Sequence, residues 1–519
     1  MIITIRNLTS NAITAHTYLS QPSKFSARFH HNKDATKPAS DDPTSSSEFT
    51  LRPLEDFTTE LPKGFTRELG LRRDGVDPRD LSGLNTPAIE KKGLLENKEW
   101  HIHPEDFKIR FSMSLGASWQ VVPVPDHCPW RIYTRRITQG HHKLLILGRR
   151  NLGSFLSELP DRLPLSSVVL PGTHDTMAFH GWPISQCQSP STLLSTQLLG
   201  GIRIIDIRLA VIPPPSPVPD NISRQLIAYH GLWPQKTSFV TILHDIHTFL
   251  TSPIGSKETI VMSIKQEDFA VTPSPFFSQM VRETIIKSAG GWDDSKPSKT
   301  GISRGMWFLE NRIPTLREVR GKVVMFSRFG GNGAGWERGL EGIGIHPTTW
   351  PDSAKEGFEW ELKGTLVRTQ DWYGIPTFFS IPEKVRLATA NLIPPSDTSQ
   401  PILPITYFSA ASFPLAFPPT VAKGFGWPKW GLGIEGVNSR LGAWLLDQLG
   451  GSQQSAVQIA RSDGCEDEKL RKNKEAVAEE PRIRGWTFLD YYAEPEGGDI
   501  VPLLVECNYR GRKSGEEGW

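Results

Sequence analysis

The sequence has little cysteine, no excess of either charge and no long apolar run, and each shortage excludes a class of protein. Its 519 residues include four widely spaced cysteines, Cys128, Cys187, Cys465 and Cys507. This spacing fits neither a zinc site nor a dense disulfide framework, so we expect buried free thiols. Lysine plus arginine total 58 against 56 for aspartate plus glutamate, a balance that gives no case for a nucleic-acid partner.

Signals for membrane insertion and export are also lacking. No window of about 18 apolar residues occurs, so we expect no membrane-spanning helix. The first residues, MIITIRNLTSN, have no basic start followed by an apolar stretch, so we expect no secretory signal. These absences favour a cytoplasmic or peripheral membrane location over secretion. The 16 tryptophans suit a protein core, and they also suit contact with lipid headgroups.

The first part of the chain has the pattern of short strands. Residues 2–31 alternate in polarity with a period of two, and strand-like runs resume between residues 107 and 147. We therefore predict a β-sandwich-like domain of antiparallel strands over residues 1–150. Residues 33–48, KDATKPASDDPTSSSE, are polar and rich in Ser, Pro and Asp, which predicts a disordered insertion.

From about residue 152 short apolar runs alternate with stretches of helical periodicity. The apolar runs are 167–170, 202–209, 226–230, 259–264, 322–327, 364–369, 405–409 and 485–490. The helical stretches include 192–199, 239–251, 276–289, 382–392 and 437–449. Eight alternations predict an α/β domain with a parallel sheet, closed into a βα barrel, over residues 151–519. A charged, Gln- and Ser-rich segment, 450–482, predicts a solvent-exposed insertion.

Polar side chains gather where the predicted strands end. The first strand, in VVLPGTHDTM, ends at His174 and Asp175, with Gly172 expected to serve the turn by tolerating a positive φ. In GIRIIDIRL, Asp206 and Arg208 are two apart and share one strand face. Later strand ends contribute His230, Lys265, Arg328, Asp371, Tyr373 and Asp490. Because a βα barrel gathers these ends on one face, we expect one active site there.

Two histidines, several carboxylates and an arginine fit phosphodiester cleavage by an internal hydroxyl. One imidazole can take the proton of the attacking hydroxyl, and the second can protonate the leaving oxygen. A carboxylate beside each ring would fix its tautomer, and a guanidinium would meet the phosphate oxygens.

The same residues resemble a known family. LPGTHDT, then QLLGGIRIIDIR, then YHG resemble the X-domain of phosphatidylinositol-specific phospholipases C of the bacterial, metal-independent type. The resemblance spans residues 155–510 and implies an irregular TIM (βα)8-type barrel. Residues 1–150 lie outside it and resemble the β-rich N-terminal extension of fungal phospholipase-like proteins.

The resemblance implies a role for each catalytic candidate. His174 would be the general base, oriented by Asp490, and His230 the general acid, supported by Asp175. Asp447 competes with Asp490 as the partner of His174. We prefer Asp490 because 485–489 has a strand pattern, whereas 437–449, which contains Asp447, has a helical one.

The resemblance also bears on metal and cofactor use. Arg208, with Asp206 beside it, would neutralise the phosphate. Calcium-dependent relatives place a carboxylate where Arg208 stands, so we expect no metal and no cofactor.

Substrate and membrane contacts complete the prediction. Inositol hydroxyls would be held by Lys265, Arg328, Asp371 and Tyr373. In the Pro- and Gly-rich segment 413–431, predicted to be a loop, exposed aromatic side chains would suit a bilayer surface, namely Phe425, Trp427 and Trp430. Their burial over the barrel mouth is an equal alternative.

The predicted activity is cleavage of an inositol phospholipid to diacylglycerol and a cyclic inositol phosphate. A glycerophosphodiester-type phosphodiesterase on the same barrel is one alternative, which would need paired carboxylates for a metal. A non-catalytic lipid-binding barrel is the other.

Overall fold

The structure of the protein is a computed structural model. It describes residues 1–19, 47–61, 65–73, 107–110, 118–217, 221–291, 297–298, 301–302, 305–330, 343–395, 400–428, 432–451, 481–495 and 498–512. Most of the two predicted insertions, 33–48 and 450–482, lies outside these residues. The chain divides into an N-terminal unit, Met1–Arg149, and an α/β unit, Arg150–Trp519.

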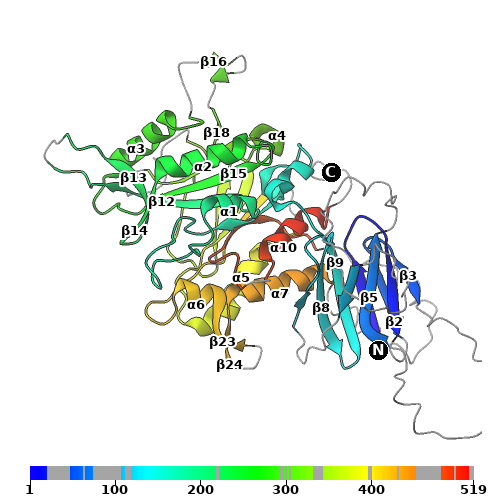
Figure 1. Ribbon diagram of the computed structural model, residues 1–519. Coiled ribbons are helices and arrows are strands. Elements are labelled where there is room, and N and C mark those ends of the chain that lie inside the picture. The colour runs from blue at the N-terminus through cyan, green and yellow to red at the C-terminus, as the bar shows by residue number, and fades with distance from the viewer. Residues whose placement is uncertain are drawn as a thin grey trace, which may run out of the picture. The chain divides into compact units, whose positions relative to one another are not determined.

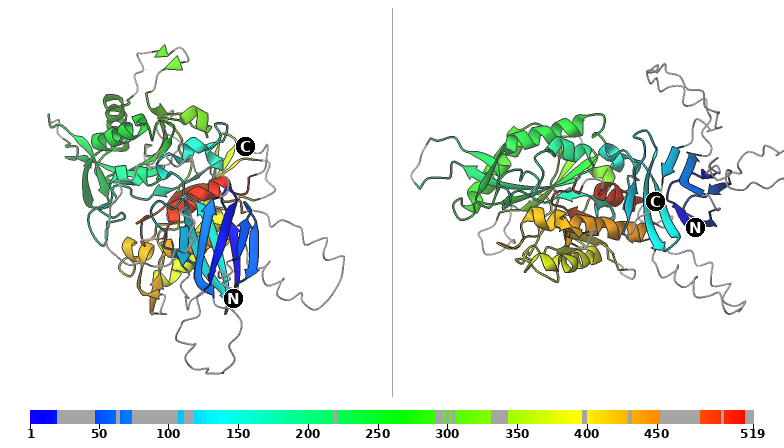
Figure 2. Two further views of the ribbon diagram at one scale, coloured as in Figure 1. Left: turned by 45° about the vertical axis from the view of Figure 1, so that its right-hand side comes forward. Right: turned by 60° about the horizontal axis from the view of Figure 1, so that its bottom comes forward.

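The N-terminal unit consists of two sheets, whose strands lie side by side in Figure 2 (blue to cyan). The first has the order β4 (Asp56–Glu60), β1 (Ile2–Asn7), β9 (His141–Gly148), β8 (Trp130–Thr138) and β7 (Gln120–Val122). The second has the order β3 (Glu48–Leu51), β2 (Ile13–Leu19), β5 (Phe65–Arg73) and β6 (Phe107–Arg110). Both sheets contribute to one hydrophobic core, which contains Ile3, Ile13, Leu69 and Ile132.

One pairing in this unit departs from the prediction of antiparallel strands. β1 lies between β4, which is antiparallel to it, and β9, which is parallel to it. Alternating polarity reports only which face of a strand is buried, so it does not reveal the direction of the neighbouring strand.

The α/β unit contains two larger sheets. One has the order β14 (Trp233–Ser238), β13 (Gln225–His230), β12 (Ile204–Ile212), β15 (Thr259–Gln266), β19 (Lys322–Arg328) and β18 (Trp307–Phe308), with β11 (Gly172–Thr173) also beside β12. The other has the order β10 (Val169–Leu170), β25 (Gly485–Phe488), β22 (Ile402–Tyr407), β21 (Thr365–Gln370) and β20 (Phe358–Leu362). Two small hairpins are β16 (Pro297–Ser298) with β17 (Gly301–Ile302), and β23 (Gly424–Trp427) with β24 (Leu432–Glu435).

Helices separate most of these strands (Figure 1). The α-helices are α1 (Leu194–Leu199), α2 (Phe239–Thr251), α3 (Ser274–Lys287), α4 (Leu316–Val319), α5 (Ile381–Asn391), α6 (Pro418–Lys423), α7 (Val437–Leu449) and α10 (Ile500–Glu506). The 3-10 helices are η3 (Leu152–Glu158), η4 (Leu165–Ser167), η6 (Phe378–Ser380) and η8 (Cys507–Tyr509). In the described part of the chain, no helix is both long and apolar enough to cross a membrane.

The five predicted helices are present, and two of them have the predicted bounds. α2 begins after Ser238, whose hydroxyl accepts a hydrogen bond from the Thr241 amide. The prediction of a loop over 413–431 is wrong, because this segment contains α6 and β23, and β23 pairs with β24 just beyond it. Prolines at the first turn of α6 are compatible with a helix, since the amides there need no partner within the helix.

Residues 169–173 connect the two larger sheets. β10 is parallel to β25, and β11, which follows after Pro171, is parallel to β12. Thr173 also forms a parallel bridge to Leu489, just beyond β25. The parallel strands β21, β22, β25, β10 with β11, β12, β15 and β19 therefore follow one another, and their C-terminal ends face the same edge.

The prediction that residues 226–230 form one of the parallel strands is wrong. β13 is antiparallel to β12 and continues into β14 as a hairpin. β12 extends to Ile212, and β13 returns along it, so that Leu209 pairs with Ala228. His230 therefore comes back toward the level of Arg208 on the return strand of a hairpin.

Candidate active site

The position of His174 follows from the connection between the sheets. It comes directly after β11, between β12 and the end of β25. Arg208 of β12 and Asp490, two residues beyond β25, therefore lie on either side of it. Backbone hydrogen bonds fix the turn, since the His174 amide donates to the Leu489 carbonyl at 3.0 Å.

Both nitrogens of the His174 ring have a polar partner. Nδ1 is 2.9 Å from Asp490 Oδ1, and Nε2 is 2.8 Å from Arg208 Nη2. A guanidinium only donates hydrogen bonds, so Nε2 accepts here, and the ring proton of a neutral imidazole resides on Nδ1. Burial and the positive charge of Arg208 hold the pKa of His174 well below its usual value. His174 is thus a neutral imidazole whose Nε2 can accept a proton.

His230 has the opposite arrangement. Its Nδ1 is 2.7 Å from the Ser185 carbonyl oxygen, and its Nε2 is 3.2 Å from Asp175 Oδ2. Both partners are hydrogen-bond acceptors, so each ring nitrogen has a partner to which an N–H can donate. The two imidazole rings are nearly perpendicular, with centroids 6.5 Å apart. One ring can therefore take a proton while the other supplies one.

Asp175 connects the two histidines. Its Oδ2 is 3.2 Å from Nε2 of His174 and 3.2 Å from Nε2 of His230, and its Oδ1 is 2.6 Å from Arg208 Nε. Its backbone has a φ of 42°, a left-handed conformation that aspartate tolerates better than most residues. Burial raises the pKa of Asp175, and the nearby Arg208 and His230 oppose that rise. The carboxylate thus contacts both imidazoles and the guanidinium.

Arg208 is held by three carboxylates. Besides Asp175, it contacts Asp206 Oδ2 through Nε at 3.2 Å and Glu267 Oε1 through Nη1 at 3.2 Å. Burial alone would lower the pKa of Arg208, but these carboxylates raise it well above its usual value. Asp206 is itself fixed by the Ser263 hydroxyl, which donates to its Oδ1 at 2.9 Å. The guanidinium therefore stays charged and oriented beside the two histidines.

A cavity of about 460 Å³ opens beside these groups. In its wall the Arg328 guanidinium lies 3.9 Å from the ring centre of Trp350 and donates to the Tyr407 hydroxyl at 2.9 Å. Trp350 Nε1 donates to Asp371 Oδ2 at 2.9 Å. The wall is thus an aromatic surface with charged groups fixed on it, a composition typical of small-ligand pockets.

The cavity wall continues with further polar groups. Tyr373 donates its hydroxyl proton to Asp352, and this bond raises the pKa of Tyr373 to about 12. Lys265 Nζ is 3.3 Å from Glu267 Oε1. The positive charge of Arg208, followed by burial, lowers the pKa of Lys265.

The structure brings together all ten side chains predicted from the sequence. Eight line the cavity, namely His174, Arg208, His230, Lys265, Arg328, Asp371, Tyr373 and Asp490. The other two, Asp175 and Asp206, lie behind Arg208 and contact it. Asp447, the competing partner of His174, is an exposed residue of α7. Phe425 is 44 % exposed, whereas the side chain of Trp427 and all of Trp430 lie outside the described residues.

Sequence reasoning missed several residues of the site. Glu267 could have been found, because it lies two residues after Lys265 and shares its strand face. Trp350 and Asp352 lie in an irregular segment before β20 and carry no pattern that points to the cavity. Cys187 lines the cavity as a buried thiol, as the prediction for the cysteines required, and Cys128 and Cys507 are also buried and free.

Curated proteins with similar sequences share one description. A 1-phosphatidylinositol phosphodiesterase of Listeria monocytogenes is 33 % identical over 180 residues, which are 33 % of this chain and 48 % of the relative. One from Staphylococcus aureus strain Newman is 27 % identical over 232 residues, which are 42 % of this chain and 64 % of the relative. The chain thus spans about half to under two thirds of the length of these relatives. No family model matches the sequence.

Solved structures similar to this one include two bacterial phosphatidylinositol-specific phospholipases C. The enzyme of S. aureus has a TM-score of 0.47 and 21 % identity, with 69 % of this chain and 98 % of that chain covered. The enzyme of L. monocytogenes has a TM-score of 0.40 and 20 % identity, with 69 % and 99 % covered.

The fold is α/β, and its candidate site combines two imidazoles, a guanidinium and several carboxylates around one cavity. In sequence the chain is similar to proteins described as 1-phosphatidylinositol phosphodiesterases.

Proposed function

We propose that the protein is a phosphodiesterase that cleaves an inositol phospholipid into diacylglycerol and a cyclic inositol phosphate. One observation carries the proposal: Asp175 contacts His174, His230 and Arg208, so two imidazoles and a charged guanidinium are held in one cluster. The relatives named 1-phosphatidylinositol phosphodiesterase support the substrate class.

In the proposed reaction the substrate phosphate lies against Arg208. The inositol 2-hydroxyl replaces the guanidinium at His174 Nε2 and gives its proton to that nitrogen as its oxygen attacks phosphorus. The bond from phosphorus to the diacylglycerol oxygen breaks, and His230 Nε2 protonates this oxygen. Asp490 stabilises the imidazolium that forms on His174, and general acid–base steps of this kind contribute roughly 10²–10⁴-fold each.

The part of the cavity wall that carries Lys265, Arg328, Asp352 and Asp371 suits a ring with many hydroxyl groups. A polyol needs acceptors for its hydroxyl protons and donors for its oxygens, and this wall presents both. Asp371 and Asp352 supply carboxylate oxygens, whereas Lys265 and Arg328 supply charged donors. We assign inositol binding to this wall, with Tyr373 at its edge.

The fold inferred for this function is an irregular βα barrel with an N-terminal β-sandwich. The neighbouring parallel strands, in the spatial order β21, β22, β25, β10 with β11, β12, β15 and β19, support the barrel. The hydrophobic core shared by the two N-terminal sheets supports the sandwich. The β13 hairpin is the irregular part, because it replaces a parallel strand and supplies His230.

A peripheral membrane contact is part of the proposal. The sequence predicts that Phe425, Trp427 and Trp430 contact the bilayer surface. The exposure of the Phe425 side chain supports this role for Phe425. Two further aromatic residues are close in sequence to the cavity lining: Trp182, 71 % exposed, precedes Ile184 by two residues, and Phe413, 77 % exposed, follows Ala411 by two. Exposed aromatic side chains of this kind favour binding at a bilayer surface.

The test is incubation of the protein with vesicles of mixed phospholipids, with and without a chelator, followed by identification of the water-soluble product. We expect a cyclic inositol phosphate in both conditions, and a loss of roughly 10²–10⁴-fold in His174→Ala and His230→Ala. Loss of activity in chelator would instead favour the glycerophosphodiester-type alternative. Vesicle binding without any product, unchanged in His174→Ala, would favour a lipid-binding barrel.

A further inference from the structure

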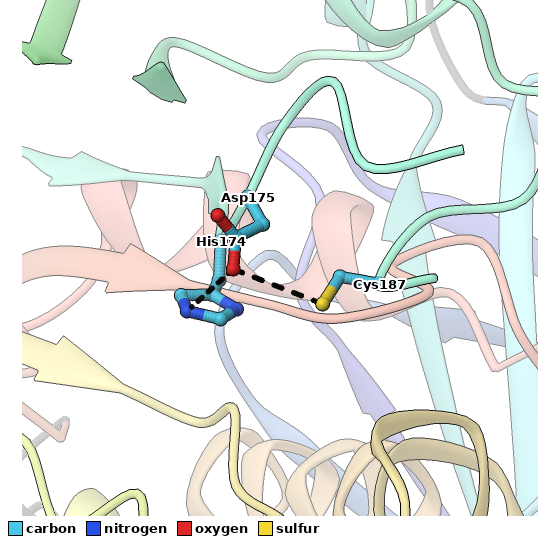
Figure 3. A group of neighbouring side chains, drawn as sticks. All are labelled: His174, Asp175 and Cys187. Atoms are coloured by element: carbon cyan, nitrogen blue, oxygen red, sulfur yellow. Dashed lines mark hydrogen bonds and ion pairs between the residues drawn. The ribbon is translucent and has the colours of Figure 1, made fainter. Parts of the chain in front are cut away.

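Cys187 places a sulfur atom among the acid–base residues. Its Sγ is 3.8 Å from Asp175 Oδ2, and Asp175 Oδ2 is 3.2 Å from His174 Nε2. Figure 3 shows the carboxylate of Asp175 between the imidazole and the sulfur. The three donor atoms lie within 4.8 Å of one another. The proposed reaction gives this thiol no role.

We infer that His174, Asp175 and Cys187 form a binding site for a thiophilic divalent cation of the zinc class, and that this cation inhibits the enzyme. The inhibition rests on the proposed phosphodiesterase function, whereas the binding does not.

The separations of the donor atoms fit such an ion. Bonds of about 2.0–2.1 Å to nitrogen or oxygen and about 2.3 Å to sulfur, at tetrahedral angles, place neighbouring ligand atoms about 3.3–3.6 Å apart. The oxygen–nitrogen separation of 3.2 Å and the oxygen–sulfur separation of 3.8 Å are close to this range, and all three donor atoms lie within 4.8 Å of one another, so binding requires the His174 and Cys187 side chains to close on the ion. His174 and Cys187 both line the cavity, which gives the ion a path of entry and leaves its fourth position open.

The chemistry of the donors selects the class of cation. Calcium and magnesium require several oxygen ligands, and this set offers one carboxylate. Nitrogen and thiolate sulfur favour zinc and related ions. The thiolate and the carboxylate together neutralise a divalent charge, and the thiol proton is released to solvent on binding.

The surrounding charges explain how binding would inhibit. The ion takes the His174 Nε2 lone pair that Arg208 now occupies at 2.8 Å, and Arg208 keeps Asp206 and Glu267 as partners. The base then has no free lone pair, and Asp175 is drawn from His230 to the ion. Proton uptake and proton supply are both blocked.

The direct test is titration of the metal-free, full-length protein with Cd²⁺ while thiolate-to-metal charge-transfer absorption is recorded. We expect a saturable band in the wild type and in Cys507→Ser, which removes a buried cysteine that does not line the cavity. The band should be absent in Cys187→Ser, and His174→Ala, which keeps the thiol, should bind Cd²⁺ at least about tenfold more weakly. An equal band in the wild type and Cys187→Ser would overturn the inference.

Inhibition is measured with Zn²⁺ against each variant's own metal-free rate. We expect Cys187→Ser to need at least about tenfold more Zn²⁺ for half inhibition than the wild type, and a chelator to restore the wild-type rate. Equal Zn²⁺ sensitivity of the two proteins would contradict the inhibitory role. The Cd²⁺ band needs no substrate, so a protein with the band but without phosphodiesterase activity would refute only the proposed function.

Discussion

At the scale of single residues, the two histidines of the site differ in the polar groups that surround their ring nitrogens. His174 has Asp490 at Nδ1 and both the Arg208 guanidinium and the Asp175 carboxylate at Nε2, whereas His230 has the Ser185 carbonyl at Nδ1 and Asp175 at Nε2. Burial and the positive charge of Arg208 lower the pKa of His174, which favours its neutral imidazole. The proposed roles of His174 as base and His230 as acid rest on these neighbours.

Asp490→Asn is the sharpest test of how the base is oriented. An amide keeps the size of the side chain but can neither stabilise an imidazolium nor fix the Nδ1–H tautomer. We expect kcat to fall by roughly 10²–10⁴-fold with little change in KM, because Asp490 acts through His174. Steady-state kinetics checks this. Asp447→Asn, on the exposed face of α7, is the control and should leave kcat within a few-fold. A larger loss in Asp447→Asn than in Asp490→Asn would refute the pairing.

The pH dependence follows from the lowered pKa of His174. Its usual value is 6.5, and burial together with Arg208 brings it well below that in the folded protein. A general base must be unprotonated, so kcat/KM should fall only as the pH drops through this lowered pKa. We expect the acidic limb of the pH profile to have its midpoint below 6.5. A midpoint above 6.5, with the protein still folded by circular dichroism, would contradict the assignment.

The same shift affects stability in acid. Between the folded and unfolded pKa values the unfolded chain binds a proton that the buried imidazole does not. His174 therefore lowers the free energy of unfolding as the pH falls below 6.5.

At the scale of elements, Gly172 sets how closely β11 approaches its neighbours. The predicted reason for this glycine, a positive φ in a turn, is wrong, because Gly172 lies within β11 and has no positive φ. A Cβ at this position would lie 2.5 Å from the Thr487 carbonyl oxygen and 2.6 Å from Ile204 Cβ. The glycine therefore allows close packing of strands two residues before His174.

Gly172→Ala should lower both stability and activity. The added methyl group forces β11 away from β12 and β25, at a cost of about 1–3 kcal/mol or more, and displaces His174. Thermal unfolding and steady-state rates measure the two effects. Gly148→Ala, where no atom lies within 4 Å of the added Cβ, is the matched control and should change neither. Equal effects of the two substitutions would show that close strand packing is not the cause.

Sequence patterns located elements well but not their directions. The helices 239–251 and 437–449 have the predicted bounds, because an amphipathic period of 3.6 residues is a local property. The direction of β13 was predicted wrongly, because a run of five residues has the same composition whether its neighbour is parallel or antiparallel.

At the scale of the whole molecule, the chain consists of two units. In the described residues no sheet combines strands of both units. Strands β1 to β9 belong to Met1–Arg149, and strands β10 to β25 belong to Arg150–Trp519. Each unit therefore forms its backbone hydrogen bonds without strands from the other. The N-terminal unit also has its own hydrophobic core.

We expect the segment Arg150–Trp519, produced alone, to fold and to retain catalysis. All ten predicted site residues lie in it, so hydrolysis of a soluble substrate should stay within a few-fold of the full chain. Cooperative thermal unfolding would show that the segment is folded. A folded segment with no activity would show that residues 1–149 contribute to the site.

The sequence by itself determined the alternation of strands and helices and the types of residue at the strand ends. These depend on local periodicity and on side-chain chemistry, which a single sequence displays. Only the tertiary structure decided that His230 returns on a hairpin, that Trp350 and Cys187 join the site, and which nitrogen of each histidine meets which partner. Such contacts join residues that are tens to hundreds of positions apart, so only the packing of the folded chain brings them together.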